Sequence, residues 1–224
     1  MRSVVVAFGL VVVAMQLAFE ALACSPSAWG DSQLVEQVKA VKLGKITSKE
    51  SIRLIPVLNC KDTDFQNGCA GAPIKNGVEG LELERNGDWV CVAVPGKRPL
   101  DILTGWFPAK KWQVIEDLHA PKNWAGVWQN GNAKLLVKNQ NNQILINGKG
   151  LWVGSYSPHF GEFTVLGTPR DGVVVDDASF EPGFGGCQIA LRLVGNFIYA
   201  ADNSNCGAIN VSFSGLYRYR FKLK

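Results

Sequence analysis

Two histidines are the residues of this chain most suited to acid–base chemistry, and they lie far apart in the sequence. His159 lies in SYSPHFGEF, close to Ser155, Ser157 and Glu162, whereas His119 lies in a predicted linker. A nucleophilic enzyme needs a histidine within reach of its nucleophile and a third group that orients the ring. Because the chain lacks a Gly-x-Ser-x-Gly motif, the pattern favours a solvated loop histidine over a catalytic one.

The acidic segment VVVDDASFEPGFGG is a second place where chemistry could occur, because it holds Asp176, Asp177 and Glu181. A glycoside hydrolase needs two carboxyl groups about 5–10 Å apart, on either side of a sugar bond. Loops of this composition are usually only solvated. A hydrolase with a site near His159 and the Asp176/Glu181 loop is therefore an alternative, and the main prediction is a protein that is not an enzyme.

The segment CKDTDFQNGC has part of the spacing of a calcium loop. Asp62 and Asp64 fit the alternating oxygen ligands of an EF-hand, but Asn67 comes one position late. Cys60 and Cys69 enclose the segment, so a disulfide-closed turn explains it better. With few histidines and with cysteines better used in disulfides, the sequence predicts no metal site and no cofactor.

The cysteine count points to an oxidising compartment. The chain has six cysteines, an even number that fits three disulfides. Exported proteins form disulfides, whereas cytoplasmic proteins rarely keep them. A two-residue turn at Gly195-Asn196 would place Cys187 opposite Ser204, only two residues from Cys206. Since a disulfide needs Cα atoms within about 7 Å, Cys187–Cys206 is predicted. The other four cysteines allow three pairings, of which we prefer Cys60–Cys69 with Cys24–Cys91.

The N-terminus is typical of a signal peptide covering residues 1–23. Arg2 precedes a mostly apolar run over residues 4–19, and Ala21-Leu22-Ala23 supplies the small residues that a signal peptidase reads. The run is too short and interrupted for a membrane span. Acylation of Cys24 would leave an odd number of cysteines, so a soluble periplasmic or secreted protein is favoured over a lipoprotein.

A break at EDLHAPKNWAG divides the rest into a first domain, residues 24–118, and a second, residues 119–224. In the first, DSQLVEQVKAVKLG predicts a helix that Asp31 caps and Gly44 ends. The following pattern is β, with a hairpin turn at Asn86-Gly87. Its candidate strands are IRLIPVL, the two halves of LELERNGDWVCVAV, and the two parts of TGWFPAKKWQVI.

The second domain is almost entirely β, and its regular turns predict an antiparallel barrel of about eight strands. One of the expected turns is Asn147-Gly148. The tail alternates from Ile209 onward, which predicts a long closing strand with its odd residues in the core and Arg218, Arg220 and Lys222 in solvent. Gly215 would let that strand bend. The candidate strands are GVWQ, AKLLVK, QILIN, LWVGSY, EFTVL, GVVVD, CQIALRLV, FIYAA and the tail.

Three segments carry a resemblance to known proteins. GDWV (residues 87–90) and GWF (residues 105–107) resemble a bacterial SH3-like domain, and the Gly-x-Trp of residues 126–128 is similar to the start of small lipocalin-like barrels. DNSNCGAINVSFSGLYRYR is similar to the tail of uncharacterised exported bacterial proteins that combine two such domains. The resemblance implies an all-β fold, an SH3-like small barrel with one N-terminal helix followed by a second barrel, and a place in the cell envelope.

Aromatic side chains are the main candidates for a binding site. Tryptophan and phenylalanine near the edge of the first sheet would form a groove for a peptide or a glycan if they were exposed. Two further tryptophans could line the mouth of the second barrel, whose interior should be mostly filled. The candidate binding residues are Trp89, Trp106, Phe107, Trp112, Trp128 and Trp152.

The net charge of +4, without a basic cluster, does not support binding of nucleic acid.

The signal peptide, the SH3-type segment and the lack of a catalytic constellation predict a non-catalytic envelope protein. Its partner would be peptidoglycan or a protein that acts on it, such as a lysozyme or a delivered toxin. The other alternative is a carrier of small apolar ligands, which needs a barrel cavity above roughly 300 Å³. The oligomeric state stays open.

Overall fold

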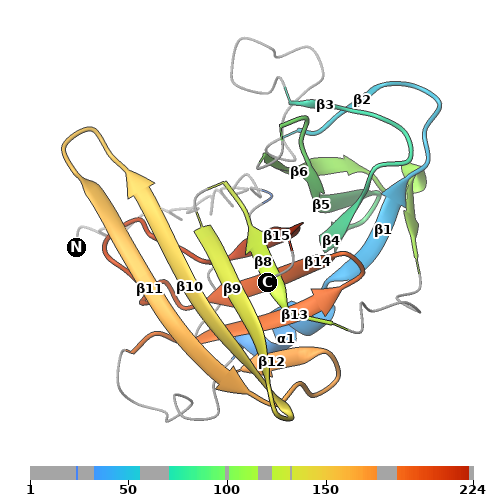
Figure 1. The fold of residues 1–224 in the computed structure, drawn as a ribbon. Coiled ribbons are helices and arrows are strands. Elements are labelled where there is room, and N and C mark those ends of the chain that lie inside the picture. Colours follow the sequence, from blue (N-terminus) through green and yellow to red (C-terminus); the bar gives the residue numbers. More distant parts are fainter. Residues whose placement is uncertain are drawn as a thin grey trace, which may run out of the picture.

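A computed structural model describes residues 24, 33–55, 71–98, 101–115, 123–131, 133–175 and 186–221. The described chain is mostly β-structure with one short helix. It forms a five-stranded antiparallel sheet, which we call the small unit, and a nearly closed eight-stranded antiparallel sheet, which we call the barrel. The two lie side by side in Figure 1. The expected all-β architecture is thus found at this level.

The small unit is a curved sheet whose last strand returns to pair with its first, in the order β6-β5-β4-β1-β7. Asn86 pairs with Trp89, so the tight turn consists of Gly87 and Asp88, one residue later than expected. Gly87 takes φ +53°, a conformation that favours glycine. The elements are β1 (Lys42–Ile46), β2 (Ile52–Arg53), β3 (Pro73–Ile74), β4 (Glu79–Asn86), β5 (Trp89–Pro95), β6 (Ile102–Pro108), the 3₁₀ turn η3 (Ala109–Lys111) and β7 (Trp112–Val114).

The barrel has the strand order β11-β10-β9-β8-β15-β14-β13-β12. Its edge strands β11 and β12 follow one another in the chain and come into contact, since a Cβ atom at Gly167 of β11 would meet the carbonyl oxygen of Val175 in β12. Its strands are β8 (Gly126–Gln129), β9 (Ala133–Gln140), β10 (Gln143–Val153), β11 (Pro158–Gly167), β12 (Val173–Val175), β13 (Ile189–Val194), β14 (Phe197–Asp202) and β15 (Gly215–Phe221).

Glycines inside the barrel make room for aromatic rings. A Cβ atom at Gly148 would overlap the ring of Phe163, and one at Gly150 would press on Phe213. The Phe163 and Phe213 rings meet edge to face with 4.7 Å between their centroids. The expected turn at Asn147-Gly148 is therefore wrong: β10 continues through it, because this glycine serves close packing and not a change of chain direction.

The helix α1 (Leu34–Ala40) lies on the outer face of the barrel, against β12, β13 and β14. Leu34 and Val38 are completely buried there. The helix is shorter than predicted, since Val41 is already extended and Gly44 lies inside β1. The ring of Trp112 covers Gly44 so closely that no Cβ atom would fit. Gly44 thus allows ring packing and does not end the helix, while the expected cap Asp31 lies outside the described residues.

The small unit, the helix and the outer wall of the barrel share one hydrophobic core. β14 is buried along its whole length, because one face points into the barrel and the other into this shared core. The two units therefore pack as one body. The fully or largely buried members of the shared core are Leu34, Val38, Val41, Leu43, Leu81, Ala93, Val173, Ala190, Val194, Phe197, Tyr199, Ala201 and Leu216.

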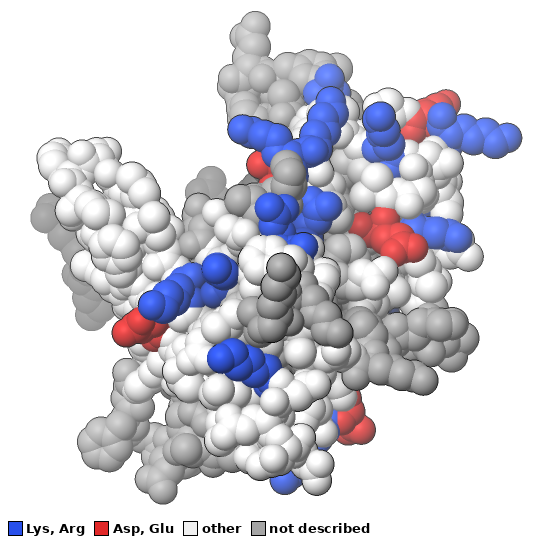
Figure 2. All heavy atoms as spheres, in the orientation of Figure 1, with Lys and Arg blue, Asp and Glu red and all other residues white. Residues whose placement is uncertain are grey.

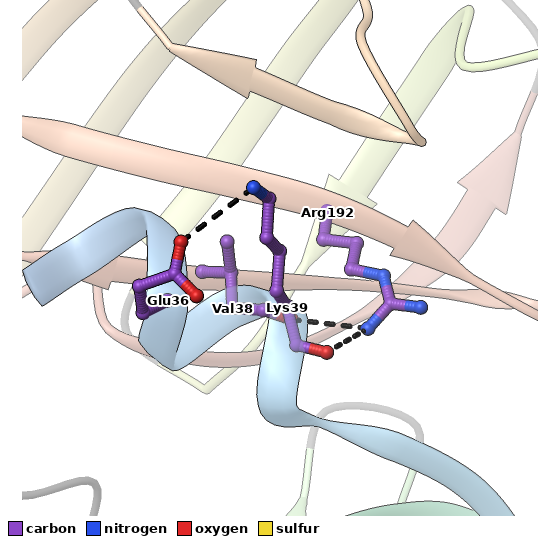
Figure 3. Close-up of polar contacts among 4 residues, drawn as sticks. All are labelled: Glu36, Val38, Lys39 and Arg192. Atoms are coloured by element: carbon purple, nitrogen blue, oxygen red, sulfur yellow. Dashed lines mark hydrogen bonds and ion pairs between the residues drawn. The ribbon is translucent and has the colours of Figure 1, made fainter.

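Arg192 on β13 ties the end of the helix to the barrel. One of its guanidinium nitrogens donates to the carbonyls of Val38, Lys39 and Val41 at 3.3, 2.6 and 2.8 Å, as Figure 3 shows for the first two. The carbonyls at the end of a helix lack partners within the helix and carry its partial negative charge. A cation from the neighbouring strand therefore caps this helix, which has only seven residues.

We expect Arg192→Ala to lower the free energy of unfolding by about 2 kcal/mol, since it removes charge-assisted hydrogen bonds to partly buried carbonyls. Arg192→Lys keeps the charge and should lose about half as much, because the lysine side chain is shorter and brings its ammonium group less close to the three carbonyls. Urea denaturation of the three proteins measures both effects. Equal stability of Arg192→Ala and the parent protein would contradict the capping role.

The tail differs from its expected form. Strand β15 begins only at Gly215, where φ is +128°, and Ile209 is 76% exposed. Tyr217 is buried in the barrel as expected, but Tyr219 and Phe221 are exposed, because β15 passes the end of the packed core and its pairing with β8 shifts register between them. Leu216, on the opposite face, is buried in the shared core. The prediction that all odd positions face the core is thus wrong.

Candidate functional site

A cleft of about 540 Å³ lies between the small unit and the barrel. One wall is the β5–β6 hairpin, and the other is the β8–β9 turn together with the segment that leads into β15. Polar and apolar groups contribute to it in similar measure. The lining residues are Leu83, Ala93, Arg98, Asp101, Ile102, Leu103, Thr104, Asn130, Gly131, Tyr199, Ser212, Ser214, Gly215 and Leu216.

The floor of the cleft is the edge of the shared core. Leu83, Ile102 and Leu216 present apolar surface there, and Tyr199 lies beside them almost fully buried. Burial raises the pKa of the Tyr199 hydroxyl well above its ordinary value, and a hydrogen bond with Gln37 only partly opposes this. The floor is therefore uncharged and largely apolar, a surface on which an apolar part of a ligand can rest.

The rim of the cleft is charged on the small-unit side. Nε of Arg98 lies 3.0 Å from Oδ2 of Asp101 within the β5–β6 hairpin, and the Arg98 side chain is 86% exposed. Arg218 of β15 reaches the Arg98 carbonyl oxygen at 3.5 Å, which brings a second guanidinium group to the same rim. Figure 2 shows basic side chains at the junction of the two units. These three residues together carry a net positive charge.

Hydroxyl and amide groups form the opposite wall. A buried carboxylate positions them: Asp202 accepts hydrogen bonds from the Ser212 and Ser214 hydroxyls at 3.1 and 2.7 Å. It also accepts one from the backbone N–H of Phe213 at 2.7 Å. Asn130 on the β8–β9 turn completes this wall. The cleft thus offers a cation at one rim, fixed hydroxyls at the other and an apolar floor between them.

Most of the predicted binding residues do not reach this cleft. Trp106 and Phe107 are completely buried, and Trp112 and Trp128 are only 7% and 2% exposed. The first three were expected to form a groove and Trp128 to line the barrel mouth, but they instead fill three hydrophobic cores. Trp128, for example, donates from Nε1 to the Trp124 carbonyl oxygen and packs edge to face on Tyr219. These four rings are therefore structural, because the cores leave them too little surface for a ligand.

Trp89 and Trp152 are the two predicted binding residues that stay half-buried. Trp89 lies at the start of β5 beside the Cys24–Cys91 disulfide, and Trp152 lies near the end of the β10–β11 hairpin. The six candidates thus belong to different units and do not converge on one site.

The two disulfides in the described part of the chain are those expected there. Cys24 is bonded to Cys91 and Cys187 to Cys206, with Cα–Cα distances of 5.4 and 4.3 Å. Val194 pairs with Phe197, as the hairpin reasoning for the second bond required. Cys60 and Cys69 lie outside the described residues, as does the whole calcium-like segment. Two disulfides indicate an oxidising location outside the cytoplasm.

The residues considered for catalysis are only partly described. Nδ1 of His159 lies 2.6 Å from the carbonyl oxygen of Ile209, and its ring packs on Trp152. His119, Asp176, Asp177 and Glu181 lie outside the described residues. Within the described ranges, no group of three or more His, Cys, Asp or Glu side chains is placed to hold a metal ion.

Sequence reasoning missed the cleft because its residues come from segments far apart in the chain. Arg98 and Asp101 belong to PGKRPLDIL, an insertion between two strands, while Ser212 and Ser214 lie in what was expected to be a regular strand. The continuous apolar run of Phe197–Ala201 was the available signal that the outer barrel wall is covered, since a strand buried on both faces lacks alternation.

Comparison with models of known protein families, with curated proteins and with solved structures gives no match for this chain. In the described part of the chain, no helix is both long and apolar enough to cross a membrane.

Proposed function

We propose that this chain is an exported, non-catalytic binding protein of the bacterial cell envelope, and that it binds its ligand in the cleft between the small unit and the barrel. The small unit would be SH3-like, which its curved five-stranded sheet with a returning last strand supports. The barrel would be lipocalin-like in architecture. The disulfide between Cys24 and Cys91 supports a soluble periplasmic or secreted form, because a sulfur atom in a disulfide cannot also carry a thioether-linked lipid.

The observation that carries this proposal is the mixed lining of the cleft. Peptidoglycan combines sugar rings, which have apolar faces and many hydroxyls, with short peptides that carry carboxylates. A carboxylate suits the rim at Arg98 and Arg218, while sugar or peptide polar groups suit the hydroxyls of Ser212 and Ser214. A protein that acts on peptidoglycan, such as a lysozyme, would present its own acidic groups to the same rim.

The carrier alternative finds no support in the described barrel interior. Phe163, Phe213 and Tyr217 extend into it and are 7% exposed or less, and glycines opposite two of the rings allow close packing. This agrees with the expectation of a mostly filled barrel. We therefore place the ligand outside the barrel.

We expect Arg98→Ala to weaken binding to purified peptidoglycan sacculi about tenfold, because it removes a charge-assisted contact at the rim. The side chain is exposed, so the stability of the protein should not change. Arg170→Ala is the matched control, since Arg170 is an exposed arginine of the barrel away from the cleft. Co-sedimentation with sacculi and inhibition of lysozyme are the two measurements. The proposal would be contradicted if the parent protein neither bound sacculi nor inhibited lysozyme. Equal effects of the two substitutions would also contradict it.

A further inference from the structure

The β10–β11 hairpin extends beyond the neighbouring strand of the barrel. Pairing between β9 and β10 ends at Ala133 and Gly150, whereas pairing between β10 and β11 continues to Val153 and Pro158. In Figure 1 the hairpin ends as a projection away from the rest of the barrel. Three residues beyond Gly150 at about 3.4 Å each make a two-stranded ribbon about 10 Å long, without counting its turn. We call this ribbon, residues 151–160, the hairpin tip.

The hairpin tip has no formal charge and a largely apolar outer face. From Gly150 to Gly161 the sequence contains no Lys, Arg, Asp or Glu. Leu151 pairs directly with Phe160, and the two are 39% and 66% exposed. Val153 and Tyr156 are 73% and about fully exposed. In Figure 2 the end of this projection is free of blue and red spheres. Soluble proteins rarely concentrate such large apolar groups on a projecting element unless it contacts a partner.

The opposite face of the hairpin tip keeps the ribbon in shape. Trp152 and His159 face each other across the strands with 5.0 Å between ring centroids. His159 and Phe160 are also tied to the 207–211 segment, because the Ala208 N–H donates to the Phe160 carbonyl oxygen at 3.1 Å. An isolated two-stranded ribbon is marginally stable in water, so these contacts hold the tip in place without covering its outer face.

Basic side chains follow immediately behind the apolar tip. Lys149 precedes Leu151 by two residues on the same face, and Lys134 of β9 pairs with Lys149 across the sheet. Glu162 lies 3.9 Å from Lys149 and offsets part of this charge. The base of the tip therefore carries two exposed ammonium groups and one carboxylate. The tip is apolar and rich in aromatic side chains, and the charge at its base is net positive. This combination is complementary to a bilayer with anionic headgroups.

We propose that the hairpin tip inserts into the interface of a lipid bilayer that contains anionic lipid, with Lys134 and Lys149 at the headgroups. The length of the ribbon agrees with the roughly 5–10 Å to which interfacial segments enter a bilayer. The convex shape fits a deformable lipid surface, because a projection offers no groove of its own. This contact is independent of the cleft and of the ligand proposed for it.

Co-sedimentation with vesicles tests this proposal. The parent protein should bind vesicles of phosphatidylethanolamine with phosphatidylglycerol and bind neutral phosphatidylcholine vesicles more weakly. The double change Leu151→Ser with Phe160→Ser should lower the partition coefficient at least about tenfold, since it removes the largest apolar pair from the tip. Phe221→Ser is the matched control, because Phe221 is a similarly exposed phenylalanine on β15, three strands away from β10 in the sheet. This variant should bind like the parent protein.

Two further measurements separate a lipid surface from other partners. Lys134→Gln with Lys149→Gln should weaken binding to the anionic vesicles about fivefold per lysine and leave binding to neutral vesicles unchanged. Brominated lipids should quench the parent protein's fluorescence, and Trp152→Phe should remove most of that quenching. Failure of the parent protein to sediment with anionic vesicles, or equal losses with Phe160→Ser and Phe221→Ser, would overturn the proposal. A lipid-free dimer that Phe160→Ser dissociates would also overturn it, because the tip would then contact a second copy.

Discussion

The double substitution Cys24→Ala with Cys91→Ala is expected to lower the free energy of unfolding by about 4 kcal/mol. The bond connects residues 67 positions apart, and a cross-link that closes a long loop removes much conformational entropy from the unfolded chain. It also fixes residue 24 onto the middle of the small unit, against the fully buried Trp106. Urea or thermal denaturation under non-reducing conditions measures the loss.

The second described disulfide provides the matched control for this expectation. Cys187 and Cys206 are separated by 19 positions, so the same loop-entropy reasoning gives about 3 kcal/mol for Cys187→Ala with Cys206→Ala. The change in the small unit should therefore be the more severe of the two. If the Cys187→Ala with Cys206→Ala variant proved the less stable of the two, loop closure would not explain what each disulfide contributes to stability. Local packing around Cys206 would then be the better explanation.

We expect Asp202→Ala to lower the free energy of unfolding by about 3 kcal/mol. The carboxylate is 4% exposed and accepts three hydrogen bonds from residues 212–214. Its loss leaves the buried Phe213 N–H without its acceptor, and an unsatisfied buried donor costs about 1–3 kcal/mol by itself. Since Ser212 and Ser214 line the cleft, this change should also weaken binding to sacculi, which a co-sedimentation assay would detect.

Two milder variants test whether the carboxylate itself matters. Asp202→Asn keeps the shape but turns an amide donor toward other donors, so about half of the loss is expected. Ser212→Ala removes one exposed hydroxyl and should cost about 0.5–1 kcal/mol, the ordinary net value of one hydrogen bond. Comparable stability of Asp202→Ala and Ser212→Ala in urea denaturation would show that Asp202 does not organise this wall.

Several features of the fold could be predicted because they depend on neighbours in the chain. The Gly195-Asn196 hairpin gives the register of β13 and β14, and this register brings Cys187 near Cys206. Short β-patterns separated by turn residues likewise predict the strand number of the barrel closely. Such features follow from local backbone preferences and from the period of side chains along a strand.

Glycine was the main source of local error, because it has two physical uses that look the same in a sequence. At Gly87 it permits a positive φ in a turn, and a turn was correctly expected there within one residue. At Gly148 and Gly44 it leaves space for the rings of Phe163 and Trp112. Only the position of the partner ring, which comes from elsewhere in the chain, distinguishes the two uses.

The candidate site could not be predicted in the same way. The tryptophans were plausible binding residues by type, but type alone does not reveal whether a large ring lies in a core or on a surface. The cleft exists because two β-sheets pack against each other, and its walls come from the β5–β6 hairpin and from residues 212–216. No local sequence pattern in either segment indicates that the two segments lie next to each other.

The sequence by itself determined the β-character of this protein, the approximate number of its strands and the pairing of Cys187 with Cys206, because turns, alternation and hairpin register are local properties. It left the partner of Cys24 open among three pairings, because Cys24 and Cys91 are 67 positions apart and no local pattern connects them. The tertiary structure alone decided what covers the outer wall of the barrel. Leu216 and Tyr217 show the reason: adjacent residues of one strand are buried in two different cores, one shared with the small unit and one inside the barrel. Which surfaces remain open for a ligand or a membrane depends on that packing.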